Sequence, residues 1–217
     1  MTDVSNFNNQ STGEEIGNAV THGVGALLAA AGTAVMIVRA CLTSDAIGVV
    51  SASIYGFSMI FLYTMSCLYH ALTNLRAKKV FQVFDHCSIF LLIVGSYTPI
   101  CLSLLRGAWG WALWGANLGL GVLGIVFNAI NVKKYHRASL VLYLLMGWSV
   151  VIAAVPLLPK LTLPGLLLLV GGGLCYSFGV PFYKAERPRY MHFIWHFFVL
   201  AGSVLHYFFI LYYALPL

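Results

Sequence analysis

The segment Ile47–Leu72 reads IGVVSASIYGFSMIFLYTMSCLYHAL and contains no Asp, Glu, Lys or Arg. The hydrocarbon core of a bilayer takes about 20 apolar residues as a helix, so this segment predicts a membrane-spanning helix. Six further apolar runs predict six more spans: Val20–Val38, Val80–Leu104, Trp109–Ile130, Ser139–Leu158, Leu161–Phe182 and Met191–Leu215. The sequence therefore predicts an all-α integral membrane protein, built as a seven-transmembrane helix bundle.

The composition excludes a soluble fold. Of the 217 residues, 60% are hydrophobic and only 8% are charged, whereas an ordinary soluble domain is about 25% charged. The net charge of +6 comes from basic residues in the short gaps between apolar runs, which indicates cytoplasmic loops and not a nucleic-acid partner. The number of cysteines is odd and none form a CxxC pair, so we expect no disulfide framework or thiolate cluster. They are Cys41, Cys67, Cys87, Cys101 and Cys175.

The chain is expected to divide into a polar cytoplasmic N-terminal segment, residues 1–17, and a single seven-helix transmembrane domain, residues 18–217. The first segment lacks the basic and apolar runs of a secretory signal peptide, so the first span itself is expected to direct insertion. No gap between the spans is long enough for a soluble domain. We expect a multi-pass protein of the cell membrane whose partners are membrane lipids; the sequence does not indicate its oligomeric state.

Lys and Arg residues are distributed unevenly between the two sides of the predicted bundle. The second, fourth and sixth gaps between spans carry nine of them: Arg76, Lys78, Lys79, Lys133, Lys134, Arg137, Lys184, Arg187 and Arg189. The other side carries three, Arg39, Arg106 and Lys160. Cytoplasmic loops carry the excess of positive charge, so the N-terminus is predicted to be cytoplasmic and the C-terminus to lie outside.

Ionisable side chains inside the spans are costly and indicate function. Asp85 is the only acidic residue within a predicted span, and it lies near the start of the third. His70 lies near the end of the second span, and the pair His192 and His196 lies near the start of the seventh. At 1.5 Å per helical residue, all four lie within about 10 Å of the cytoplasmic boundary. Three helices therefore bring histidine and aspartate side chains to one depth of the membrane.

The spacing of these residues predicts a zinc site. His192 and His196 are four residues apart, as in metalloprotease helices in which two imidazoles bind one metal. His70 from another helix completes a three-imidazole set, which leaves a fourth position for water. Imidazoles near a carboxylate suit Zn²⁺ better than Mg²⁺ or Ca²⁺. Asp85, and Ser66 one turn before His70, could hold that water as catalytic residues. The alternative is that each histidine merely hydrogen-bonds a neighbouring helix.

A set of motifs runs in order along nearly the whole chain. They are Glu14-Glu15-x-x-Asn18-x-x-x-His22, Ser66-x-x-x-His70, Phe84-Asp85-His86, His192-x-x-x-His196 and Gly202-Ser203-x-x-His206. This set resembles the bacterial hemolysin III family, within the progestin and adipoQ receptor family that includes the adiponectin receptors. The resemblance implies a seven-helix bundle with a cytoplasmic N-terminus. It also implies zinc on His70, His192 and His196, with Asp85 and Ser66 approaching the metal through water.

The other histidines have separate expectations. His22 could cap the site from the first span, although a packing role is the alternative. His86 is rotated by about 100° from Asp85 on its helix, so the two are not expected to face the metal equally. His206 lies about 15 Å beyond His196 along the helix, which predicts an interhelical hydrogen bond. His136, among basic residues, is expected to face lipid headgroups.

Three functions are compatible with these features. The first is a zinc-dependent hydrolase of a membrane lipid amide or ester, with Asp85 as general base and Ser66 orienting the water; ceramidases offer an analogy. The second is a non-enzymatic sensor or regulator of membrane state with structural zinc. The third is a channel-forming cytolysin, but no predicted span shows the continuous polar stripe that a conducting pore requires. The sequence does not name a substrate.

Overall fold

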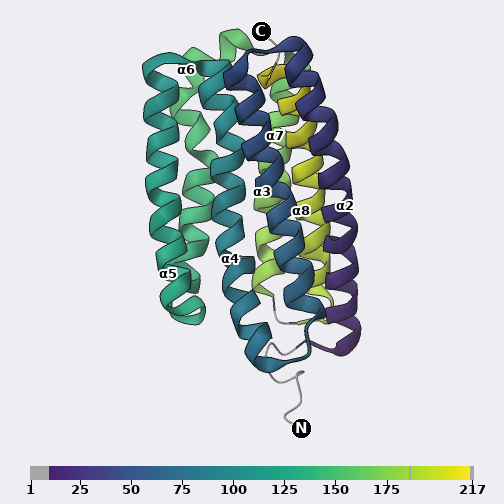
Figure 1. Ribbon diagram of the computed structural model, residues 1–217. Coiled ribbons are helices and arrows are strands. Elements are labelled where there is room, and N and C mark those ends of the chain that lie inside the picture. The colour runs from purple at the N-terminus through teal and green to yellow at the C-terminus, as the bar shows by residue number, and fades with distance from the viewer. Residues whose placement is uncertain (1–9, 186, 216–217) are drawn as a thin grey trace.

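The computed structural model describes residues 10–185 and 187–215, which form a helical bundle without β-strands in those ranges (Figure 1). The helices are α2 (Thr12–Thr43), α3 (Ala46–Ala71), α4 (Leu75–Thr98), α5 (Gly107–Trp148), α6 (Ala154–Leu157), α7 (Leu163–Lys184) and α8 (Met191–Phe209). Wider π-helical turns follow α4 at Pro99–Leu105 and α8 at Ile210–Ala214. Tighter 3-10 turns, Ser149–Ala153 and Leu158–Lys160, flank α6.

Within the described ranges, six helical stretches are long and apolar enough to cross a membrane. The sequence predicts seven spans, and the difference lies in a single stretch. Gly107–Lys160, which contains α5, covers both of the predicted spans Trp109–Ile130 and Ser139–Leu158. The all-helical membrane architecture is thus confirmed, while the count of seven stays a prediction.

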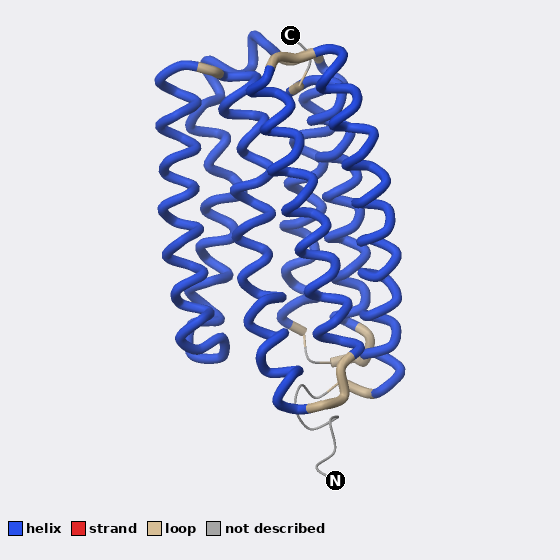
Figure 2. The backbone as a smooth tube through the Cα atoms, in the orientation of Figure 1, coloured by secondary structure: helices blue, strands red, loops and turns tan. Residues whose placement is uncertain are grey.

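Helix α5 is broken at Asn131 and its two arms pair with each other. Asn131 has extended backbone angles, φ −167° and ψ 104°. The side-chain nitrogen of Asn117 donates to the Ser149 hydroxyl across 2.9 Å. A straight helix would place these two residues about 48 Å apart. Figure 2 shows the tube turning back at the lower end of α5, so that the arms run side by side in opposite directions.

The break has a local cause in the sequence. The side-chain oxygen of Asn131 accepts a hydrogen bond from the backbone N–H of Lys134 at 2.9 Å, as a helix N-cap does. Lys133, Lys134 and Arg137 follow directly and interrupt the apolar run. Further along the arms, the Ser139 hydroxyl donates to the Asn128 side chain at 2.8 Å. Polar pairs of this kind hold two helices together in an apolar environment.

Successive helices run in alternating directions, so α2 begins at the lower end of the bundle in Figure 1 and α8 ends at the upper end. At the lower end, a Glu14 carboxylate oxygen accepts the backbone N–H of Tyr190 at 2.6 Å. At the upper end, the Arg39 guanidinium donates to the carbonyl of Leu211 at 3.0 Å. Hydrogen bonds therefore join α2 to the start of α8 and to the turn that follows it.

Helix α2 begins inside the predicted polar segment 1–17, of which residues 1–9 lie outside the described residues. Ser11 is the N-cap, and its hydroxyl accepts the N–H of Glu14 while the Glu14 carboxylate accepts the N–H of Ser11. This reciprocal capping box satisfies two of the free donors at the start of the helix. The polar residues after Ser11 are therefore the first turns of α2.

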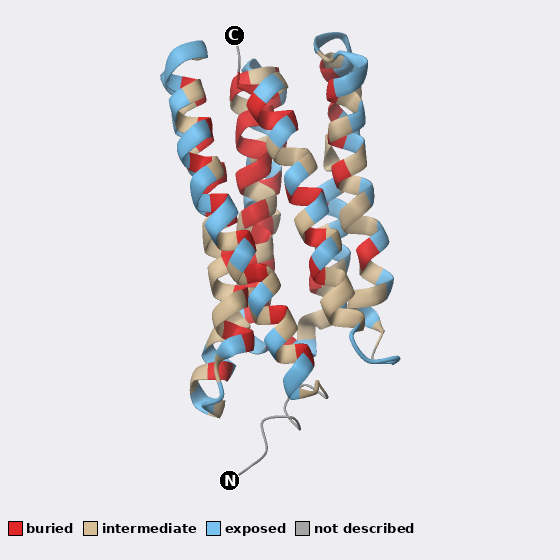
Figure 3. Cartoon of the chain, turned by 90° about the vertical axis from the view of Figure 1, so that its right-hand side faces the viewer, coloured by how far each residue is buried: buried red, intermediate tan, exposed pale blue. Residues whose placement is uncertain are grey.

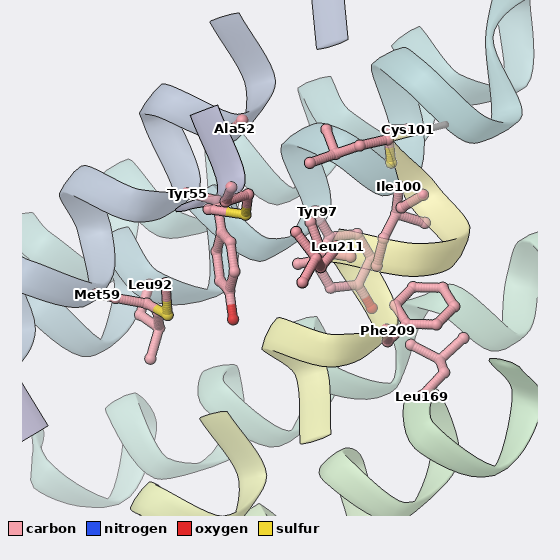
Figure 4. Packing of buried hydrophobic residues seen from close by; sticks show 14 of the residues in the cluster. Ala52, Tyr55, Met59, Leu92, Tyr97, Ile100, Cys101, Leu169, Phe209 and Leu211 are labelled. Atoms are coloured by element: carbon pink, nitrogen blue, oxygen red, sulfur yellow. The ribbon is translucent and has the colours of Figure 1, made fainter. Parts of the chain in front are cut away.

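The core of the bundle is apolar and lies mostly in its upper half. Tyr55, Tyr97, Ile100 and Phe209 are among its buried members, and Figure 4 shows them converging from α3, α4 and α8 with the turns that follow. Figure 3 shows exposed residues alternating with buried ones along the outer helices. Many exposed side chains are large and apolar; Leu27, for example, is 74% exposed. Such a surface suits lipid and not water.

Glycines differ in their roles along α5. A Cβ atom on Gly124 would overlap the ring of Phe90, so this glycine allows α4 and α5 to approach closely. A Cβ on Gly115 or Gly119 would meet no atom within 4 Å among the described residues. Small residues allow close helix packing in membranes, and in α5 this applies to Gly124 but not to Gly115 or Gly119.

Candidate metal centre

Three histidines from two helices meet at the lower end of the bundle. His70 lies on the last turn of α3, and His192 and His196 lie one turn apart at the start of α8. One ring nitrogen from each lies within 4.8 Å of the others. His70 and His196 are almost completely buried, and His192 is partly buried. The prediction that these three side chains lie together is confirmed, and the cluster could hold one metal ion.

The imidazole of His70 has one ring nitrogen that is hydrogen-bonded and one, Nε2, that is available to bind a metal. Its Nδ1 lies 2.7 Å from the Oε2 atom of Glu15. Its Nε2 is buried without a hydrogen-bond partner among the described residues. A buried unpartnered nitrogen costs about 1–3 kcal/mol, so this atom fits a metal ligand better than a packing group.

His196 shows the same arrangement. Its Nδ1 lies 3.1 Å from the hydroxyl oxygen of Thr21. That hydroxyl lies 2.9 Å from the carbonyl oxygens of Gly17 and Asn18, to which it donates. The hydroxyl proton is thereby used, so the oxygen accepts the Nδ1–H of His196 and leaves the imidazole Nε2 lone pair free. Helix α2, which provides none of the three histidines, thus contacts both His70 and His196.

Asp85 and Ser66 lie together beside the histidines. Ser66 is only 2% exposed, and Asp85 is partly buried. Both side chains line a cavity that His192 and His196 also line. The Asp85 carboxylate lies 3.7 Å from the Nδ1 atom of His86. All five residues singled out from the sequence therefore lie at one end of the bundle.

The cavity leads from the histidines into the apolar interior. It has a volume of about 130 Å³ and extends as far as Tyr97 and His206. A second cavity of about 140 Å³ shares Tyr97, Trp148 and His206 with it and continues towards Leu158. Most of the lining is aliphatic or aromatic. An extended apolar space with polar groups at one end suits an amphipathic molecule.

The other histidines lie in distinct places. His22 stacks on His196 and meets Tyr63 edge-on. His206 Nε2 lies 3.1 Å from the carbonyl oxygen of Leu169, which is the predicted interhelical hydrogen bond. The Tyr183 hydroxyl lies 3.4 Å from ring nitrogens of both His86 and His136. His136 therefore contacts α7, and its position facing lipid headgroups stays a prediction.

Two residues that contact the cluster, Glu15 and Thr21, have no role that the sequence predicts. A signal for α2 was present, because Glu14, Asn18 and His22 recur every four residues and all three are buried. That stripe marks the inward face of the helix. Glu15 and Thr21 flank the stripe, and their contacts depend on how α2 is rotated against α3 and α8.

Known proteins resemble this chain over nearly its full length. A family described as Haemolysin-III related matches residues 10–207. Hemolysin-3 of Bacillus cereus is 40% identical over 216 residues, which covers 100% of this chain and 99% of that protein. A Hemolysin-3 homolog of Bacillus subtilis (strain 168) is also 40% identical, over 93% of this chain and 94% of that protein.

A more distant similarity extends to animals. The human monocyte to macrophage differentiation factor is 29% identical over 205 residues, covering 90% of this chain and 82% of the human protein. This is a protein of the progestin and adipoQ receptor type. The family match and the three relatives agree with the resemblance that the ordered sequence motifs indicate.

Proposed function

The chain belongs to the Haemolysin-III related family and is a multi-pass membrane protein of the cell membrane, and on that basis we propose that it is a zinc-dependent hydrolase of a membrane lipid. The observation that carries the proposal is the position of the histidine cluster at the polar end of an apolar cavity. A lipid's acyl chain would lie in the cavity and its amide or ester carbonyl would lie beside the histidines. Binding of this kind would orient the scissile bond.

The three imidazoles suit zinc. His70, His192 and His196 would hold the ion, and three protein ligands leave a position open, as in catalytic zinc sites. Neutral imidazole nitrogens with few hard oxygen ligands favour Zn²⁺ over Mg²⁺ or Ca²⁺. Zinc bound there would supply Lewis-acid polarisation of a carbonyl and a hydroxide-like nucleophile at neutral pH.

Asp85 would transfer the proton during hydrolysis, and Ser66 would orient Asp85. Hydrolysis adds water across the acyl C–N or C–O bond, so one proton leaves the attacking water and one reaches the leaving amine or alcohol. The Asp85 carboxylate would accept the first proton and return it to the leaving group. The Ser66 hydroxyl lines the same cavity as Asp85, and it would donate to the carboxylate and hold it in the orientation needed.

We further propose that the two arms of α5 are separate spans, which gives seven crossings. The supporting observations are the break at Asn131 and the hydrogen bond between Asn117 and Ser149. Seven crossings put the chain ends on opposite sides. With nine Lys and Arg residues on the side where α2 begins and three on the other, the lower end of the bundle would face the cytoplasm.

The test combines metal content with lipid hydrolysis. Purified protein in detergent or vesicles is incubated with a ceramide and with a glycerophospholipid, and release of free fatty acid is measured. We expect release by the wild type, loss after removal of metal with a chelator, and recovery with Zn²⁺. Asp85→Asn should keep its zinc but lose fatty-acid release, because an amide cannot accept the proton.

Two other functions are separate outcomes of the same experiment. Zinc binding without any fatty-acid release would favour a non-enzymatic sensor or regulator of membrane state, in which zinc is structural. Two relatives carry the name hemolysin, so release of a dye from vesicles by the wild type and by Asp85→Asn alike would favour a channel-forming cytolysin.

A further inference from the structure

Three polar side chains from three helices, His70, Glu15 and Lys78, contact one another in sequence at the histidine cluster. Nδ1 of His70 on α3 lies 2.7 Å from Oε2 of Glu15 on α2. The other carboxylate oxygen of Glu15, Oε1, lies 3.0 Å from Nζ of Lys78 on α4. Each oxygen of Glu15 thus has its own partner, and neither Glu15 nor Lys78 belongs to the ligand set.

Lys78 is held in place although it is charged and fully buried. Its ammonium group donates to the carbonyl oxygen of Tyr69 at 3.0 Å and lies 3.4 Å from that of Leu72. These carbonyls lie at the C-terminal end of α3, where the helix dipole favours a positive charge. The ammonium also lies 5.0 Å from the centre of the Tyr69 ring. With these partners, the buried cation is compensated and fixes the carboxylate beside it.

We propose that Glu15 is a positioning residue of the metal centre and that Lys78 fixes the orientation of Glu15. This proposal rests on the proposed metal centre. The carboxylate accepts the Nδ1–H of His70, which selects the tautomer whose Nε2 lone pair is free. It also holds the ring at the angle that brings a nitrogen within 4.8 Å of those of His192 and His196. A carboxylate partner makes the imidazole a stronger ligand.

The adjacent residue provides a matched control. Glu14 lies in the same first turn of α2 and is buried, but its carboxylate binds Ser11 and the backbone N–H of Tyr190. Glu14→Gln and Glu15→Gln each replace a carboxylate by an amide of the same size. Both remove one negative charge from the same helix turn, and only Glu15→Gln alters the hydrogen bond to a histidine of the cluster.

The experiment measures zinc affinity by competition with a chelator, on full-length protein that elutes as a folded species in detergent. Loss of an outer-shell partner typically weakens metal binding by about 10–100-fold, and we expect this for Glu15→Gln. A glutamine oxygen at position 14 can still accept the Tyr190 N–H, so Glu14→Gln should bind zinc like the wild type, even if its melting temperature falls. The visible spectrum of the Co²⁺-substituted protein should change in Glu15→Gln and stay unchanged in Glu14→Gln.

The outcomes separate this inference from the proposed function. Equal zinc affinity and equal Co²⁺ spectra in Glu15→Gln and wild type would overturn the role of Glu15 and leave the metal centre standing. A wild type that binds no zinc would overturn both. If Glu15→Gln does not fold, Glu15→Asp keeps the charge but shortens the side chain by one methylene. It should still weaken zinc binding, and wild-type affinity in Glu15→Asp would overturn the inference.

Discussion

The imidazole of His22 lies flat against that of His196, with 3.6 Å between the ring centres and 10° between the ring planes. His22 is buried, and neither of its ring nitrogens has a hydrogen-bond partner among the described residues. Its nitrogens are not among those that lie within 4.8 Å of one another in the cluster. The sequence leaves open whether His22 caps the metal site or packs against a neighbouring helix. In the structure its ring packs against that of His196, one of the cluster histidines.

His22→Phe should therefore keep the metal. Phenylalanine preserves the flat ring against His196, and it removes two buried polar atoms whose lack of partners costs about 1–3 kcal/mol each. We expect unchanged zinc content and a melting temperature no lower than that of the wild type. His196→Phe is the matched control, because it preserves the same stack but removes a ligand. Loss of zinc from His22→Phe would instead identify His22 as a ligand.

The purified protein should carry about one zinc per chain, as expected for a single three-histidine site. Replacing both His192 and His196 by Ala removes two ligands from one helix and should abolish zinc binding. His206→Ala is the control, because that ring bonds the Leu169 carbonyl and lies away from the cluster. The measurement is elemental analysis of metal-to-protein ratio; undiminished zinc in the double variant would contradict the assignment.

Reporter fusions test the course of α5 and the orientation. A reporter at the N-terminus and one inserted at Lys134 should both be cytoplasmic, and one at the C-terminus should be external. The reason is that the break at Asn131 coincides with a basic cluster, which stays on the cytoplasmic side. If α5 crossed the membrane once, six crossings would put the C-terminus on the same side as the N-terminus.

Gly124→Ala should destabilise the bundle, because the added methyl would overlap the fully buried Phe90 ring. Overpacking of this kind costs about 1–3 kcal/mol. Gly119→Ala on the same helix meets open space, and alanine favours helix over glycine by about 1 kcal/mol. Thermal unfolding in detergent should therefore show a lower melting temperature for Gly124→Ala only. A melting temperature of Gly124→Ala equal to that of Gly119→Ala would show that Phe90 moves aside freely.

The features that sequence could predict are those written in local patterns. Apolar runs predict the helices because each span meets lipid along its own length. The four-residue spacing of His192 and His196 predicts their shared face, and the alternation of spans puts His70 at the same depth. The break in α5 lies in the gap that the sequence predicts between two spans, since four polar or charged residues follow Asn131 closely.

The features that escaped prediction depend on how helices rotate against one another. Nothing local distinguishes Glu14, which closes the cap, from Glu15, which reaches His70, because they are adjacent carboxylates in the same turn. Likewise Gly119 and Gly124 look alike in sequence, and only the packing of α4 against α5 decides which of them needs to be small. Contacts between distant segments are set by the whole bundle and not by spacing along one helix.

The cap at the start of α2 also determines how much of the chain is dispensable. By composition, the polar residues before the first apolar run look like a tail that could be trimmed. Yet Glu14 both closes the first turn of α2 through Ser11 and holds the Tyr190 N–H, two residues before His192. A chain shortened past Ser11 would loosen the beginning of its first helix and, through the same carboxylate, the beginning of its last. The minimal folding unit therefore starts well before the hydrophobic sequence does.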